Sequence, residues 1–337
     1  MTRRESRGVS LNINEIATLA GVSRATVSRY LNNGYVSEQK RAAIARVIGE
    51  TGYVPSSHAQ TLRTGRSHLV GVIIPKINSE SVSRMVAGIT DVLEESGYHV
   101  VLANTGNDDE AEIQYLRVLA DRKVDGIILI ATVLDDAHRE TLAELTVPHV
   151  ILGQRAAGIT CVYFDDYQAS YDLTQGLYGS CDHPAHLGVT DLDEAAGRLR
   201  LQAFIDAMEA EGVKREDILI ERGEFSIESG REMAARVLRE HPEVNAMVCA
   251  TDSIAAGALA ALRDAGKRVP KDVQVTGIGD TEISRAVYPS LTTAHYHYRS
   301  SGRQAASLLL AALDGDQAPR EVRMGYRLLL RGSTVNE

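Results

Sequence analysis

The sequence predicts an α/β protein with an N-terminal three-helix helix-turn-helix domain and a larger core of two doubly wound lobes. Residues 11–52 have helical patterns without a strand signal, and from Leu69 onward short apolar runs alternate with amphipathic stretches. The charge changes at about the same place. Residues 1–66 carry ten Lys and Arg against four Glu, a net charge of +6, whereas the whole chain carries −9. A basic module on an acidic body suggests that only the module faces a polyanion, although an idle charged extension would have the same composition.

The composition is that of a globular protein. At about 150 residues per domain, 337 residues correspond to two or three domains, and 44% hydrophobic residues are enough to form their cores. No apolar run approaches the roughly 18 residues that cross a bilayer, and no apolar stretch follows the basic N-terminus, so we expect neither a membrane partner nor a secretory signal. The three cysteines form no CxxC pair, which is typical of reduced thiols in a cytoplasmic protein.

Residues 13–33 have the pattern of two short helices joined by a tight turn. The first helix has an apolar face formed by Ile16, Ala17 and Leu19. Gly21 follows where the chain must turn, because glycine adopts positive φ without a steric penalty. Ser23 then stands at the N-cap position of the second helix.

The second helix carries residues suited to the major groove of DNA. Val27 and Leu31 are spaced i, i+4 and point inward, and a third helix near 38–49 closes a three-helix core. The outward residues are small or basic: Arg24, Ala25, Thr26, Ser28 and Arg29. A helical hairpin without a DNA role is the alternative, but the spacing, the arginines and the local charge favour a helix-turn-helix that binds DNA.

The remainder of the chain alternates strands and helices. The expected strands are 69–75, 99–103, 126–131, 149–153, 161–164, 186–190, 217–221, 245–251, 273–279 and 291–296, with a last extended segment at 321–331. Continuous apolar strands separated by helices indicate parallel sheets covered on both faces. Ten strands exceed one comfortable sheet, so we expect two lobes with a ligand between them, at the carboxyl ends of the strands.

The N-terminal motif AGVSRATVSRYLNN and the following VSEQKRAAIARVIGETGYVPSSHAQTLRTGRS resemble the LacI/GalR family of bacterial transcription regulators. The resemblance extends over the whole chain, because the expected core is similar to the periplasmic-binding-protein-like core of that family. It implies a helix-turn-helix domain at 1–53, a hinge linker at 54–67, and an effector-binding and dimerisation core at 68–337.

The resemblance also implies which residues contact DNA. Arg24, Ala25 and Arg29 match positions that read base edges, and arginine can pair with guanine in a bidentate way. The positions that match phosphate contacts are Ser23, Thr26, Ser28 and Asn32. In the linker, Leu62 matches a leucine that wedges into the minor groove, with Ala59 beside it and Arg63 and Arg66 as phosphate partners.

The resemblance places a small-molecule effector between the lobes. The matching positions are Asn78, Ser81, Gln154, Arg200, Thr251, Asp252, Gly279, Asp280, Tyr296 and Tyr298. Thr251 and Gly279 replace polar residues that are usual in the family, whereas Arg200 is retained. Fewer polar anchors beside an arginine weakly favour a phosphorylated sugar or a sugar acid over a plain sugar. A loop-capping role is the alternative for each residue.

The expected function is therefore that of a cytoplasmic, homodimeric, ligand-responsive repressor of carbohydrate-utilisation genes on a pseudo-palindromic operator. No cofactor is expected, and Cys181, His183 and His186 are too few to predict a metal site. An enzyme on the same scaffold is the first alternative, but no catalytic constellation is present. A periplasmic sugar-binding protein is the second, and the basic N-terminus argues against it.

Overall fold

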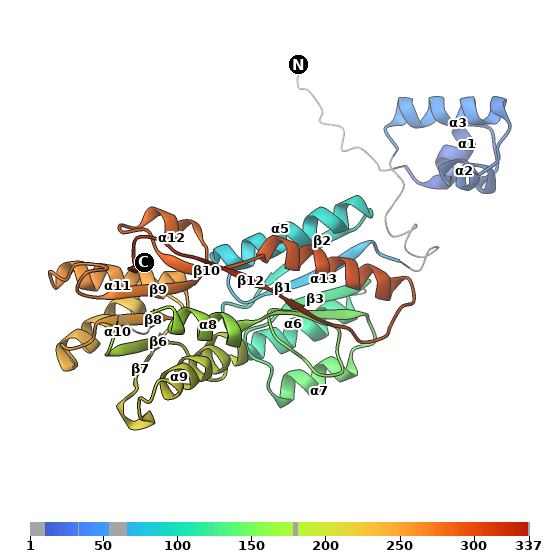
Figure 1. Cartoon of the computed structure of the whole chain (residues 1–337). Coiled ribbons are helices and arrows are strands. Elements are labelled where there is room, and N and C mark those ends of the chain that lie inside the picture. Colours follow the sequence, from blue (N-terminus) through green and yellow to red (C-terminus); the bar gives the residue numbers. More distant parts are fainter. Residues whose placement is uncertain (1–10, 33, 54–65, 123, 178–180, 336–337) are drawn as a thin grey trace, which may run out of the picture. The chain divides into compact units, whose positions relative to one another are not determined.

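The computed structural model describes residues 11–32, 34–53, 66–122, 124–177 and 181–335. They divide into two compact units, Met1–Ser67 and His68–Glu337, which are drawn in Figure 1. The first unit contains α1 (Ile13–Leu19), α2 (Arg24–Leu31) and α3 (Glu38–Thr51). Its small core consists of Ile16, Ala17, Val27, Val36, Ile44 and Val47. Leu19 was expected on the apolar face of the first helix, but it is 56% exposed and lies outside this core.

The second unit consists of two lobes, each with a six-stranded sheet (Figure 1). The first sheet is parallel and has the order β11-β5-β4-β3-β1-β2. Its strands are β1 (Leu69–Ile74), β2 (His99–Asn104), β3 (Gly126–Ile130), β4 (His149–Leu152), β5 (Cys161–Phe164) and β11 (Glu321–Met324). Its helices are α5 (Glu80–Glu95), α6 (Asp109–Asp121), α7 (Asp136–Glu144) and α13 (Tyr298–Leu313). Because apolar residues of α5 and α13 pack on one face and those of α6 and α7 on the other, the strands are covered on both faces.

The second sheet has the order β12-β10-β9-β8-β6-β7 and is parallel except for β12, which pairs antiparallel with β10. Its strands are β6 (Pro184–Gly188), β7 (Leu219–Arg222), β8 (Ala246–Cys249), β9 (Gln274–Gly279), β10 (Thr292–Tyr296) and β12 (Tyr326–Leu329). Its helices are α8 (Asp166–Gln175), α9 (Arg200–Ala210), α10 (Ile227–Glu240), α11 (Asp252–Asp264) and α12 (Glu282–Ala286), with a π-helical turn η1 at Glu194–Leu199 and a short 3₁₀ turn η2 at Arg215–Asp217. This arrangement confirms the predicted two-lobed α/β fold.

The chain crosses between the lobes three times. It crosses between β5 and α8, between β10 and α13, and between β11 and β12. The extended segment expected at 321–331 is therefore two strands in different sheets. β11 pairs with β5 and β12 pairs with β10, so the two strands on either side of Gly325 belong to different lobes. A hydropathy pattern does not reveal that separation, because both strands are extended.

Helices α5 and α13 approach each other closely at two glycines. A Cβ at Gly88 would lie 2.0 Å from the Arg299 carbonyl oxygen, and a Cβ at Gly302 would lie 2.0 Å from the Met85 carbonyl oxygen. On the outer side of the same contact, Asp91 accepts hydrogen bonds from Arg299 and Arg303. These two arginines lower the pKa of Asp91 to about 2. The contact therefore joins α5, which follows β1, to α13, which follows the second crossing between the lobes. No helix among the described residues is long and apolar enough to span a bilayer.

A buried histidine joins α6 to α7 in the first lobe. The His138 side chain is fully buried. Its Nδ1 lies 2.7 Å from Asp135 Oδ1 and its Nε2 lies 3.4 Å from Glu112 Oε1. Burial disfavours charge on the imidazole, but the nearby carboxylates of Glu112 and Asp135 outweigh it and raise the pKa of His138 to about 9.

This histidine predicts a loss of stability at alkaline pH. Since the pKa of His138 is raised from about 6.5 in the unfolded chain, its contribution is fully present below pH 6.5 and is lost as the pH rises through 9. We expect the free energy of unfolding by urea to fall by about 2–3 kcal/mol more between pH 7 and pH 10 in the wild type than in His138→Gln. His99→Gln, at an exposed histidine on β2, serves as the control; an equal pH slope in all three proteins would contradict the assignment.

Candidate functional site

The helix-turn-helix is built by local signals. Asn12 Oδ1 accepts hydrogen bonds from the amides of Asn14 and Glu15 at 2.9 and 3.2 Å, and Glu15 Oε2 accepts one from the Asn12 amide at 2.6 Å. This capping box starts α1. Gly21 has φ of +64° and forms the turn. Ser23 then caps α2 by accepting a hydrogen bond from the Thr26 amide, so α2 begins as the sequence predicts.

Helix α2 exposes two arginines, one in its first turn and one in its last. Arg24, Ala25 and Arg29 are exposed, and Thr26 and Ser28 are half-buried. Neither Arg24 nor Arg29 forms an ion pair with any residue of the described ranges, so both guanidiniums are available to an external acceptor.

The polar residues beside these arginines already have partners. The Ser23 and Thr26 hydroxyls lie 2.9 Å apart, and the Asn32 amide donates to the Ser28 carbonyl at the end of α2. Such residues can position a phosphate through their remaining lone pairs or donors. The predicted hinge positions Ala59, Leu62 and Arg63 lie outside the described residues.

A cavity of about 480 Å³ lies between the two lobes of the second unit. This volume lies within the range of small-molecule sites. Strand-end loops and helix N-termini of both lobes line it, as expected for parallel sheets. The residues of the first lobe and α13 are Pro75, Lys76, Asn78, Ser79, Glu80, Ser81, Val82, Met85, Asn107, Ile130, Ala131, Thr132, Gly153 and Tyr298. Those of the second lobe are Asp193, Phe225, Ser226, Ile227, Thr251, Asp252, Ser253, Ile278, Thr281 and Ile283.

Five of the predicted effector residues line this cavity: Asn78, Ser81, Thr251, Asp252 and Tyr298. Thr251 also caps α11, since its hydroxyl accepts a hydrogen bond from the Ile254 amide at 3.3 Å. Asp252 Oδ1 accepts from the Thr293 hydroxyl, and Oδ2 accepts from the Thr281 amide and hydroxyl. The capping alternative and the cavity position therefore coexist at Thr251, and Asp252 is engaged by the protein itself.

Arg200 does not line the cavity. It is buried, and its Nε and Nη2 donate to Asp166 Oδ1 at 2.8 and 2.6 Å. Its Nη1 donates to the Ala250 carbonyl. The fully buried Tyr296 also donates to Asp166 Oδ1, at 2.9 Å. Burial disfavours the charged guanidinium, but Asp166 outweighs it and keeps the pKa of Arg200 above its usual range.

The remaining predicted effector residues, Gln154, Gly279, Asp280 and Tyr296, are also absent from the cavity lining. Gln154 donates to the Thr132 carbonyl and to Asp193 Oδ1, both at 2.8 Å. Asp280 accepts hydrogen bonds from Arg285, Arg331 and His295. Burial opposes ionisation of Asp280, but these donors outweigh it and lower the pKa of Asp280 to about 2.

The chain resembles known regulators over its whole length. Residues 12–56 match bacterial regulatory proteins of the lacI family, and residues 179–334 match a periplasmic binding protein-like domain. The sucrose operon repressor of Staphylococcus xylosus is 34% identical over 88% of this chain and 92% of its own. The regulator CelR of Thermobifida fusca is 32% identical over 94% of this chain and 96% of its own.

Solved structures agree with these relatives. The lac repressor dimer bound to operator and an anti-inducer superposes with a TM-score of 0.89 and 26% identity, over 97% of this chain and all of that one. A CelR–cellobiose complex superposes with a TM-score of 0.74 and 29% identity, over 96% and 99% of the two chains. The chain belongs to the lacI family of bacterial regulatory proteins. It is a DNA-binding transcriptional regulator rather than an enzyme, as the sequence predicted.

Asp193 is one of the cavity residues of this lacI-family chain that the sequence did not predict. It is buried, and its Oδ1 accepts hydrogen bonds from Gln154 Nε2 and the Ala196 amide, both at 2.8 Å. It follows strand β6 and caps the π-helical turn η1. The rule that ligands bind at the carboxyl ends of parallel strands could have found it, because its segment DLD at 191–193 directly follows the strand expected at 186–190.

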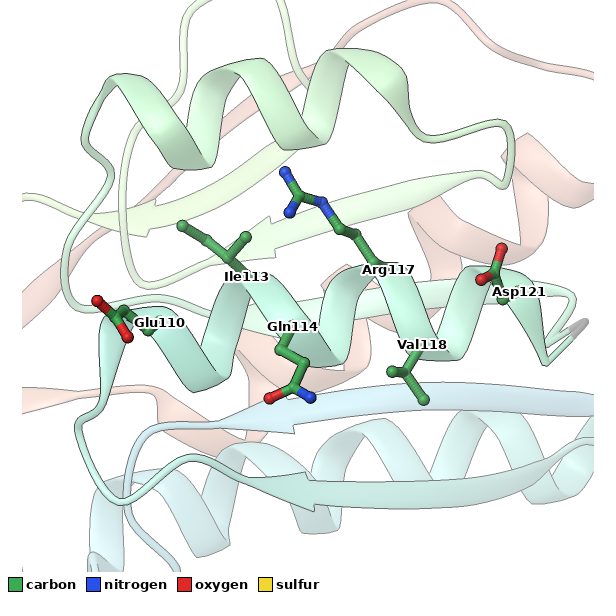
Figure 2. A pocket seen from close by; sticks show the side chains of 6 residues that line it. All are labelled: Glu110, Ile113, Gln114, Arg117, Val118 and Asp121. Atoms are coloured by element: carbon green, nitrogen blue, oxygen red, sulfur yellow. The ribbon is translucent and has the colours of Figure 1, made fainter.

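A second hollow, of about 350 Å³, lies on the outer surface of α6. Figure 2 shows that all six of its labelled residues come from this one helix. They are Glu110, Ile113, Gln114, Arg117, Val118 and Asp121. Arg117 donates to the Thr141 hydroxyl of α7 at 3.3 Å. Because a single helix lines it, the hollow lacks the convergent polar groups that characterise a ligand site.

The placement of Arg200 predicts that it stabilises the fold. We expect Arg200→Met to lower the free energy of unfolding by urea by about 3–5 kcal/mol, because it leaves the buried Asp166 carboxylate without its cation. Arg198→Met, at an exposed neighbour that pairs with Glu194, should change it by less than about 0.5 kcal/mol. Unchanged stability together with lost ligand affinity would instead make Arg200 a ligand contact.

Proposed function

We propose that this regulator is a ligand-responsive repressor of carbohydrate-utilisation genes, which binds a pseudo-palindromic operator as a homodimer in the bacterial cytoplasm and binds a sugar between its lobes. The observation that carries the proposal is the combination of an exposed basic recognition helix with an interlobe cavity in one chain. The named relatives support it, because they include a sucrose operon repressor, a ribose operon repressor and a CelR–cellobiose complex. The lac repressor dimer on its operator supports the assembly.

On DNA, α2 enters the major groove and the linker enters the minor groove. Arg24 and Arg29 read base edges, and Ala25 can contact a thymine methyl group. In the linker, Leu62 wedges between base pairs, with Ala59 and Arg63 beside it. We accordingly divide the chain into a DNA-binding domain at 1–53, a hinge at 54–67 and a core at 68–337. Two such modules related by a two-fold axis explain a pseudo-palindromic operator.

A ligand in the cavity can change the arrangement of the lobes, because the lobes contact each other at the cavity edges. Gln154 of the first lobe donates to Asp193 of the second. At another edge, Glu80 accepts a hydrogen bond from the Glu282 amide at 2.8 Å, and Arg84 donates to the Asp280 carbonyl at 3.2 Å. A ligand that favours one lobe arrangement over another shifts the population between them, and the shift changes DNA affinity through the hinge.

The recognition helix gives the test of DNA binding. We expect Arg24→Ala and Arg29→Ala each to weaken binding to an operator selected from a randomised pool by about 1–3 kcal/mol and to relax the base preference at one position. Fluorescence anisotropy across a salt series measures both effects. Arg46→Ala, an exposed arginine of α3, is the matched control and should bind nearly as the wild type does. Binding without sequence preference, or variants with unchanged affinity, would overturn the assignment of α2.

A further inference from the structure

The charges that line the interlobe cavity are mostly negative. Lys76 is the one cationic side chain among its described lining residues, against the three carboxylates of Glu80, Asp193 and Asp252. The arginine expected to hold an anion is absent from the lining, because Asp166 neutralises it in the interior. A phosphate or carboxylate in this cavity would therefore meet repulsion without a guanidinium partner.

Helices that begin at the cavity do not reverse this balance. Helices α5, α10 and α11 begin there, and helix N-termini favour negative charge. The protein already supplies that charge, because Glu80 stands in the first turn of α5, Glu228 in that of α10 and Asp252 in that of α11. Each N-cap hydroxyl also accepts a hydrogen bond from the amide of the third residue of its helix. The positive helix ends are thus matched within the protein.

One carboxylate oxygen remains open to the cavity. Both oxygens of Asp252 accept hydrogen bonds from protein donors. Asp193 uses only Oδ1, which accepts from Gln154 and the Ala196 amide. No residue of the described ranges donates a hydrogen bond to Oδ2. This oxygen is also not fully enclosed by protein atoms. Since Asp193 lines the cavity, Oδ2 is positioned to accept hydrogen bonds from a ligand.

The apolar part of the lining complements this acceptor. Phe225 and Tyr298 supply aromatic rings, and Ile227, Ile278 and Ile283 supply aliphatic surface. A ligand that presents hydroxyl groups at its edge and C–H groups on its face satisfies both kinds of contact. The side-chain amides of Asn78 and Asn107 add further donors and acceptors.

Building on the proposed sugar-responsive function, we propose that the cavity binds an uncharged polyhydroxylated ligand, a sugar or glycoside without phosphate or carboxylate groups, and that Asp193 Oδ2 accepts a hydrogen bond from one of its hydroxyls. The proposal reverses the preference for an anionic effector that the sequence suggested. Asp193 is thereby a specificity-determining residue, because a carboxylate accepts hydroxyl donors and repels anions.

Titration of Asp193 gives this proposal a second readout. Burial raises the pKa of Asp193 to about 6. The ionised form accepts hydroxyl donors more strongly than the protonated form, so sugar affinity should decrease as the pH falls from 7.5 to 5.5. The charged groups near this carboxyl are Arg200 and Asp166 behind it and Lys76, Glu80 and Asp252 around the cavity.

Isothermal titration calorimetry on the full-length protein tests the proposal. The probes are neutral mono- and disaccharides, each paired with its 6-phosphate and its sugar acid. We expect a neutral sugar to bind at least about tenfold more tightly than its charged counterparts. Asp193→Asn should weaken that binding by roughly tenfold or more and remove its decrease below pH 6. Asparagine still caps a helix, and thermal unfolding without ligand checks that the fold is kept.

Glu194→Gln is the matched control, because Glu194 is the next carboxylate in the chain, does not line the cavity and pairs with Arg198. It should bind sugar as the wild type does. Tighter binding of a phosphorylated or acidic sugar would overturn the proposal, and so would an Asp193→Asn variant with wild-type affinity and pH profile. If no sugar binds but the protein still binds its operator, this ligand class is overturned and the regulator function stands. If the protein does not bind an operator, the proposed function itself is rejected.

Discussion

The architecture of the core depends on the buried ion pair between Arg200 and Asp166. Asp166 opens α8, directly after the first crossing between the lobes, and Tyr296, which also donates to this carboxylate, ends β10 at the second crossing. One carboxylate oxygen thus ties together two of the three crossing segments and the start of α9. Such a pair adds little net stability over an apolar replacement, but the loss of one partner is costly because it leaves a buried charge. The pair therefore fixes where the lobes are joined.

Aromatic rings surround this junction. Phe164, at the end of β5, stacks on Tyr296 with ring centroids 4.6 Å apart and planes inclined by 4°, and Tyr298 meets both rings edge to face. Flat stacked rings can fill a junction tightly while still allowing small rotations. The cavity edges carry further hydrogen bonds between the lobes. Gln154 donates to Asp193 and accepts from the Ala195 amide. Glu80 accepts from the Glu282 amide. The lobes are thus joined covalently and by packed side chains at the crossings, and by a few hydrogen bonds at the cavity edges, where a small ligand can bias their arrangement.

The sequence predicted the structure correctly where interactions between residues close in the chain decide it. Gly21 and Ser23 indicate the turn and the cap of the helix-turn-helix, and the continuous apolar strands indicate two covered sheets. It failed where a partner distant in sequence decides a side chain's role. Nothing near Arg200 indicates that Asp166, 34 residues away, takes its charge, and Asp280 likewise finds Arg331 across 51 residues. Asp193 was missed for a different reason. In the sequence it has the pattern of an ordinary helix N-cap, but capping uses only one of its two carboxylate oxygens.

The separate roles of Arg200 and Asp193 also determine how ligand binding can be coupled to DNA binding. The Arg200 guanidinium is engaged at the junction and does not line the cavity, so recognition falls to Asp193, whose other oxygen already accepts a hydrogen bond from Gln154 of the opposite lobe. A hydroxyl bound at Oδ2 and the latch at Oδ1 share one carboxylate, and hydrogen bonds in a buried network polarise one another. Ligand affinity and lobe contact are then linked at a single group, which is the condition for a ligand to bind the two lobe arrangements with different affinity. An anion would instead have to be balanced by Lys76, the one cationic side chain among the described lining residues, which belongs to the first lobe alone.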